Sequence, residues 1–169
     1  MTGATLPSLS NMVIWGFVAT LVMTTVIQGA QGLGLTRLSL PFLAGTFFTG
    51  DRRRAVLVGF ALYLAGGWIF AFLYFLLFAS LGVYTWWLGL ATGVLHGLIL
   101  LVAVLPLLPY IHPRMASEYD GASAVKLLEP PGFMAMNYGH QTPLTTLAGQ
   151  ALYGTVLGGF HQFAMLLAS

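Results

Sequence analysis

Residues 89–97 read Gly89-Leu-Ala-Thr-Gly93-Val-Leu-His96-Gly97, inside the apolar run from Trp86 to Pro109. The same order of residues returns near the C-terminus as Gly154-Thr-Val-Leu-Gly158-Gly-Phe-His161. Both stretches follow the pattern Gly-x-x-x-Gly-x-x-His, whose three marked positions share one side of an α-helix. The sequence therefore predicts two membrane helices, each with a smooth strip of glycine that ends in an imidazole.

Composition indicates the class of protein. Hydrophobic residues make up 58% of the 169 positions and charged residues only 6%, whereas about a quarter of the residues of an average soluble domain are charged. The mean hydropathy is +0.88. These values predict an integral membrane protein in contact with the lipid bilayer. The absence of cysteine excludes disulfides and thiolate ligands, and the scarcity of charge argues against nucleic-acid binding.

The apolar runs predict an all-α fold, an integral membrane four-helix bundle formed by residues 1–169 as a single domain. Because a span needs about 20 apolar residues, we expect spans at about 11–35, 55–81, 86–110 and 144–167. A short helix in the interface, or one that dips back into the protein, is predicted over residues 38–48, where Ser39 and Pro41 are typical of a helix start. Residues 111–143 are expected to form an ordered cytoplasmic loop, and Pro106 and Pro109 to end the third span.

The cationic side chains predict the orientation. All six lie in the two longer connections between predicted spans, and they are Arg37, Arg52, Arg53, Arg54, Arg114 and Lys126. By the positive-inside rule, these connections face the cytoplasm and both termini face outward. Arg52, Arg53 and Arg54 are interpreted as a topology signal that also contacts anionic lipid.

The two intramembrane histidines allow several interpretations. Measured from the expected outer ends of their spans, His96 and His161 could meet in the outer half of the bundle. A b-type haem needs one axial nitrogen from each of two helices, with glycines beside the ring, so haem is one possible cofactor. A metal ion or a proton-handling site is a second interpretation. The third is plain helix packing, in which each imidazole bonds a neighbouring group such as a carbonyl, Tyr63 or Thr24.

Helix packing is the simplest role for the glycines. Small residues four apart let helix backbones approach closely without any ligand, and five glycines are assigned to such contacts: Gly89, Gly93, Gly97, Gly154 and Gly158. A short repeat accompanies them, because Gly59-Phe-Ala-Leu-Tyr63 matches Gly149-Gln-Ala-Leu-Tyr153. The repeat is compatible with an ancient duplication of a two-span hairpin.

The remaining polar residues point to no catalytic site. The loop contains His112, Glu118, Asp120, Glu129, Tyr138 and His140 without the spacing of a metal motif, so we expect a solvated loop whose carboxylates pair with Arg114 and Lys126. Thr24, Thr25, Gln28 and Gln31 could line a pathway, but such groups ordinarily form hydrogen bonds between helices. Because no nucleophile is placed beside a base, the sequence predicts a protein that is not an enzyme.

Several motifs resemble a family of small bacterial inner-membrane proteins with four spans and no established activity. The resemblance rests on His112-Pro-Arg-Met-Ala-Ser-Glu118, Leu128-Glu-Pro-Pro-Gly-Phe133, Asn137-Tyr-Gly139 and Thr142-Pro-Leu, together with Leu40-Pro-Phe-Leu-Ala-Gly-Thr46 and Trp86-Trp-Leu-Gly89. It implies a bacterial cytoplasmic-membrane location and a defined loop, and it transfers no functional residue.

The sequence thus predicts a small multi-pass protein with a non-enzymatic role. The leading hypothesis is an accessory or structural subunit that packs, through glycine faces and exposed Phe and Trp, against itself as a homo-oligomer or against a larger membrane complex. The alternatives are electron or proton transfer at a haem, metal or proton site on His96 and His161, and transport of a small solute.

Overall fold

The computed structural model describes residues 9–116 and 127–168, with side chains described as far as residue 160. Apart from one isolated β-bridge between Met115 and Leu128, the secondary structure of this part of the chain is helical. The elements are α1 (Leu9–Gly32), α2 (Leu40–Thr46), α3 (Arg52–Leu81), α4 (Trp86–Ile99), η1 (Leu100–Val104), α5 (Leu105–Ile111), η2 (Phe133–Tyr138) and α6 (Thr142–Ala168). The prediction of an all-helical fold is confirmed.

Three helices of the described chain are long and apolar enough to cross a membrane. They are α1, α3 and the continuous helix Trp86–Ile111 that α4, η1 and α5 form together. The helix α6 has 27 residues but is not among the three. Length and composition therefore support a membrane protein with at least these three candidate spans.

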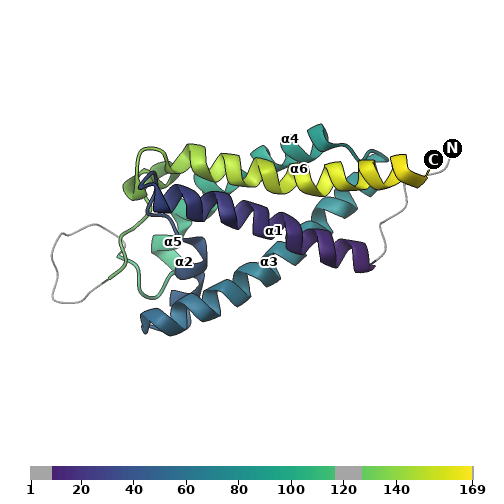
Figure 1. The fold of residues 1–169 in the computed structure, drawn as a ribbon. Helices are drawn as coiled ribbons and strands as arrows, with labels where there is room; N and C mark the ends of the chain where they lie inside the picture. The colour runs from purple at the N-terminus through teal and green to yellow at the C-terminus, as the bar shows by residue number, and fades with distance from the viewer. Residues whose placement is uncertain (1–8, 117–126, 169) are drawn as a thin grey trace.

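The long helices run between the same two ends of the molecule (Figure 1). The start of α1 lies near the end of α6 at one end, while α2, α5 and the chain before α6 gather at the other. The helix α6 packs against both α4 and α1, whereas α3 packs against α1 and α2. Although α3 and α4 are joined by a short turn, each thus finds its main partner elsewhere.

Local sequence signals set the ends of α3 and α4. The Asp51 carboxylate accepts a hydrogen bond from the backbone N–H of Arg54 at 2.8 Å, which caps the start of α3. Gly82 ends α3 with a φ of +66°, a left-handed conformation that glycine adopts without strain. The Thr85 hydroxyl then caps α4 by accepting from the N–H of Leu88. The turn between the two helices is therefore only four residues long, Gly82 to Thr85.

The helices α4 and α6 are antiparallel and touch backbone to backbone along their glycines. A Cβ built on Gly89 would overlap the carbonyl oxygen of Gly154, and a Cβ built on Gly154 would overlap that of Gly89. Gly93 meets the backbone of Gln150 in the same way, and Gly158 meets that of Thr85. The predicted glycine strips of the two helices therefore pack against each other within one chain.

A second close helix contact holds α2 against α3. Gly45 faces the carbonyl oxygen of Ala55, and Gly59 faces that of Pro41, with no room for a Cβ at either glycine. The Ser39 hydroxyl caps α2 by accepting from the N–H of Phe42 at 3.4 Å, and Pro41 lies in the first turn. The predicted short helix is therefore present, and it packs against α3.

The third candidate span continues through both of its prolines and ends shortly after them. Residues 100–104 form a π-helical segment, η1, directly before Pro106. Proline lacks an N–H and its ring clashes with the carbonyl four residues earlier, and a wider π turn relieves this conflict. The helix ends at Ile111, two residues after Pro109 and close to the predicted end at about residue 110, although Pro106 does not interrupt it.

Candidate functional site

His96 is half-buried and hydrogen-bonded within the protein. Its Nδ1 lies 3.2 Å from the hydroxyl of Tyr74 on α3, and its ring lies 4.3 Å from the ring of Phe70. Tyr74 is 5% exposed and packs edge-on against Tyr153 of α6, so His96 is attached to a rigid aromatic cluster. Its Nε2 makes no hydrogen bond to any described residue. The Nε2 edge of the imidazole therefore remains available for a further hydrogen bond.

The register of α4 and α6 separates His96 from His161. Each histidine follows the first glycine of its motif by seven residues, and these glycines, Gly89 and Gly154, lie opposite each other. Because the helices are antiparallel, the same spacing takes the two histidines toward opposite ends, a separation of about 20 Å along the axis. The expectation that the two histidines could meet is therefore wrong. A haem shared by both does not fit this register, because its iron needs an axial nitrogen from each of them. The side chain of His161 lies outside the described side chains.

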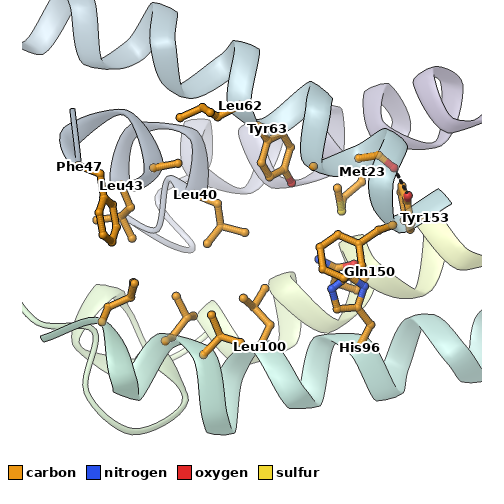
Figure 2. Close-up of a pocket in the computed structure, with 17 residues that line it drawn as sticks. Met23, Leu40, Leu43, Phe47, Leu62, Tyr63, His96, Leu100, Gln150 and Tyr153 are labelled. Atoms are coloured by element: carbon orange, nitrogen blue, oxygen red, sulfur yellow. Dashed lines mark hydrogen bonds between the residues drawn. The ribbon is translucent and has the colours of Figure 1, made fainter. Parts of the chain in front are cut away.

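His96 instead lines a cavity between α1, α2, α3, α4, η1, α5 and α6 (Figure 2). Its volume is about 270 Å³, close to the lower end of the range of about 300–1,000 Å³ typical of small-molecule sites. Figure 2 shows Leu43 and Phe47 near one end and His96, Gln150 and Tyr153 near the other. The cavity is therefore apolar along most of its length and polar at one end.

Three polar groups on this cavity have no hydrogen-bond partner among the described residues. They are the amide of Gln150, the hydroxyl of Tyr63 and the Nε2 of His96. Gln150 is only 4% exposed, and its Oε1 is the buried side-chain atom of the described chain that lacks any partner. Leaving such a buried acceptor unpaired costs about 1–3 kcal/mol. An unpaired group of this kind in a native fold calls for a bound water or ligand.

The glycine strip of α4 makes room for Gln150. A Cβ on Gly97 would lie 3.3 Å from the Cβ and 3.5 Å from the Cγ of Gln150. The side chain of Gln150 therefore passes beside Gly97 on its way to the cavity. Tyr153, one turn further along α6, has its hydroxyl satisfied by the carbonyl of Gly67 at 2.6 Å.

The remaining lining of the cavity is apolar and uncharged. It is supplied by Met23, Leu40, Leu43, Ala44, Phe47, Leu62, Gly66, Phe70, Leu100, Val104, Leu105 and Leu108, together with Gly67. None of the described lining residues carries a formal charge. Leu62 and Phe70 of α3 and Val104 of η1 are 38%, 41% and 45% exposed. The cavity thus reaches the surface of the protein between α3 and η1.

His112 and Arg114, which follow α5, bind the α2 segment that lines the Leu43 and Phe47 end of the cavity. The Arg114 guanidinium donates to the carbonyl oxygens of Thr46 at 2.6 Å and Phe47 at 3.0 Å, at the C-terminus of α2. A cation is favourable there because of the helix dipole. The Nδ1 of His112 accepts from the N–H of Arg114, and its Nε2 lies 3.2 Å from the carbonyl of Leu43. These bonds fix α2 over the cavity.

The loop therefore differs from its prediction. Among the described residues, Arg114 pairs with backbone carbonyls and not with a carboxylate, while Glu129 forms an ion pair with Arg37 at 3.2 Å. Tyr138 donates to the carbonyl of Glu129 at 2.6 Å. Burial, aided by the Glu129 charge and opposed by Arg37, raises the pKa of Tyr138 to about 12. Glu118, Asp120 and Lys126 lie outside the described residues.

Other predicted residues lie away from the cavity. Gln28 is exposed, and the Nε2 of Gln31 donates to the carbonyl of Leu38. Thr24 and Thr25 donate to carbonyls of their own helix. Arg52, Arg53 and Arg54 are exposed in the first turn of α3. In the described part of the chain, no three His, Asp or Glu side chains are grouped as a metal site.

Sequence reasoning missed Tyr63 and Gln150 as a pair, although a signal for them exists. Both belong to the repeat Gly-x-Ala-Leu-Tyr, read as Gly59–Tyr63 in α3 and Gly149–Tyr153 in α6. In each copy the glycine packs against a neighbouring helix, and the tyrosine lines the cavity. The repeat marks the two helices that supply the polar end of the site.

No family model, curated protein or solved structure matches the chain in comparisons with known proteins. The resemblance to small bacterial membrane proteins stays a prediction. The geometry of the cavity is therefore the basis on which a function can be inferred.

Proposed function

We propose that this chain is a four-span protein of the bacterial cytoplasmic membrane that binds a small hydrophobic molecule in the cavity beside His96 and Gln150, without catalysing a reaction. The observation that carries the proposal is the set of three unpaired polar groups at one end of an otherwise apolar cavity. Apolar walls with a few convergent polar groups are typical of ligand sites.

The fourth span in this proposal is α6. Its 27 residues rise about 40 Å, enough to cross a bilayer. Four polar side chains in its first half are buried, namely Thr142, Thr145, Thr146 and Gln150, whereas Leu144 and Leu152 are 69% and 39% exposed. The surface that this half of α6 offers to lipid is therefore more apolar than its composition indicates.

The charge distribution supports an orientation with both ends outside. Arg37, Arg52, Arg53, Arg54 and Arg114 all belong to the segments around α2, the start of α3 and the end of α5. By the positive-inside rule this end lies in the cytoplasm. Reporter fusions to the two termini test the topology: four spans place both reporters outside, whereas three spans place them on opposite sides.

Binding is tested with the purified full chain. Organic extracts of protein prepared in mild detergent, analysed by mass spectrometry, should contain a retained hydrophobic molecule at constant stoichiometry. Gly66 lines the cavity, and a Cβ there meets no atom within 4 Å, so Gly66→Leu adds bulk without a backbone clash. We expect Gly66→Leu to lose the molecule. Gly29→Leu, also in open space but away from the cavity, should keep it; equal retention by both variants would contradict the proposal.

A second candidate function is the accessory subunit, which now rests on exposed apolar helix faces such as that of α3. The glycine faces of α4 and α6 are used within the chain and cannot bind a partner. The outer face of α3 instead exposes large apolar side chains, among them Trp68, Ile69, Phe72 and Leu73. Such a face contacts either lipid or another protein. Cross-linking in native membranes distinguishes the two, because a subunit or homo-oligomer gives discrete larger species.

A further inference from the structure

We infer that the ligand is a long-chain neutral lipid whose head is a hydroxyl group, held by Gln150, Tyr63 and His96. This inference rests on the proposed binding function and adds the chemical class of the ligand. It follows from three features of the cavity: an acceptor without a donor, the absence of formal charge in its described lining, and an apolar channel that reaches the protein surface.

The head group is inferred from the Gln150 amide. Its Oε1 is buried and lacks a donor, so a matching ligand has to bring an O–H or N–H. Its NH₂, the hydroxyl of Tyr63 and the Nε2 of His96 are free to exchange further hydrogen bonds with the same head. A hydroxyl is both donor and acceptor and can satisfy two of these groups at once. A carbonyl or ether oxygen can only accept, and it would leave Oε1 unpaired.

The absence of formal charge among the described lining residues argues for a neutral head. Burying an ionised group without an opposite charge is strongly unfavourable. The guanidinium of Arg114 does not line the cavity and instead binds the carbonyls of Thr46 and Phe47. A fatty acid or phosphate would therefore lack a counter-charge in this part of the chain, while an alcohol needs none.

The apolar tail of the ligand is inferred from the apolar lining at the opposite end of the cavity. Leu40 and Leu43 of α2 lie across the cavity from Leu100, so an alkyl or isoprenoid tail finds apolar contacts along its length (Figure 2). The exposed rim of Leu62, Phe70 and Val104 opens between α3 and η1. In the proposed topology this rim faces the bilayer, which supplies such lipids sideways.

The experiment compares three probes of equal chain length, 1-dodecanol, its methyl ether and dodecanoic acid at pH 8, by native mass spectrometry of the full chain. We expect the alcohol to bind at least tenfold more tightly than the ether or the acid. Gln150→Leu should bind alcohol and ether equally, and Tyr63→Phe should narrow the difference. Gln28→Leu, which changes an exposed amide on α1, should leave the preference intact.

The outcomes separate the two proposals. Equal binding of alcohol and ether by the unchanged chain, or tighter binding of the acid, would overturn the hydroxyl inference and leave the binding function standing. No binding of any probe, together with no co-purified molecule, would overturn both. Because Tyr63→Phe only removes a hydroxyl that has no protein partner, its folding is not at risk.

Discussion

Gly89 and Gly154 face each other across the α4–α6 interface so closely that neither position has room for a Cβ. The contact is reciprocal, since each glycine lies against the carbonyl oxygen of the other. Close backbone approach of this kind gains dispersion contacts along the whole helix pair. It also sets the register that decides which side chains of α4 and α6 reach the cavity.

The first prediction concerns this contact. Gly89→Ala places a methyl group where the Gly154 carbonyl lies, so we expect the free energy of unfolding to fall by about 2–3 kcal/mol. Gly29→Ala is the matched control, because its Cβ meets nothing within 4 Å and alanine favours the helix by up to about 1 kcal/mol. Unfolding in detergent, followed by circular dichroism, measures both. A neutral Gly89→Ala would show that the helices are further apart.

The second prediction tests the register with introduced cysteines in a chain that has none. A Cβ on Gly159 would lie 3.3 Å from the Cβ of Trp86, close to the separation of about 3.5–4.5 Å in a disulfide. Trp86→Cys with Gly159→Cys should therefore cross-link under mild oxidation, as protection from thiol alkylation shows. His96→Cys with His161→Cys should stay reduced. Cross-linking of the histidine pair would restore the shared-cofactor hypothesis.

The third prediction separates function from stability at Gln150. In ligand-free protein, Gln150→Leu removes an unpaired buried amide and should raise the free energy of unfolding by about 1–2 kcal/mol. Gln31→Leu removes an amide that donates to the Leu38 carbonyl, so it should lower that energy by about 1 kcal/mol. Thermal unfolding of delipidated samples checks both. Destabilisation by Gln150→Leu would assign Gln150 a structural role.

The fourth prediction concerns Arg114, which binds α2 near the Leu43 and Phe47 end of the cavity. Arg114→Met removes a charged donor from the carbonyls of Thr46 and Phe47 and should destabilise the fold by about 2–3 kcal/mol. Arg114→Lys should recover part of the loss, since its ammonium keeps the charge but not the fork of donors. Arg53→Met, on an exposed arginine, is the control. The melting temperature should be lowest for Arg114→Met, intermediate for Arg114→Lys and highest for Arg53→Met.

The sequence could predict the helices and the glycine strips because both depend on local pattern. It could not predict the partner of each strip, which depends on the packing of the whole chain. Spacing alone placed His96 and His161 on equivalent faces, but pairing of Gly89 with Gly154 in antiparallel helices carries them apart. The sequence also could not show that the ends of α4 and α6 are not level: Gly158 lies against the carbonyl of Thr85 at the start of α4, and α6 continues past it to Ala168.

Gln150 was overlooked for a related reason. An amide in an apolar run carries no sign of whether a neighbour will pair with it, and Gln31 and Gln150 look alike in the sequence. In the folded chain Gln31 finds a carbonyl and Gln150 finds none. Only the three-dimensional arrangement distinguishes a structural amide from one left free for a ligand.

The number of residues in the π-helical segment η1 determines which side chains of the helix Trp86–Ile111 line the cavity. His96, Leu100, Val104 and Leu108 recur every four residues and all line the cavity, whereas a regular α-helix turns about 40° too far over each such interval. The wider π turn compensates for part of this drift. Deleting Ala103, an exposed residue of η1, would leave a helix but rotate Leu105 and Leu108 by about 100° relative to His96. Homologous chains that use the same site should therefore conserve the number of residues here more strictly than their identity.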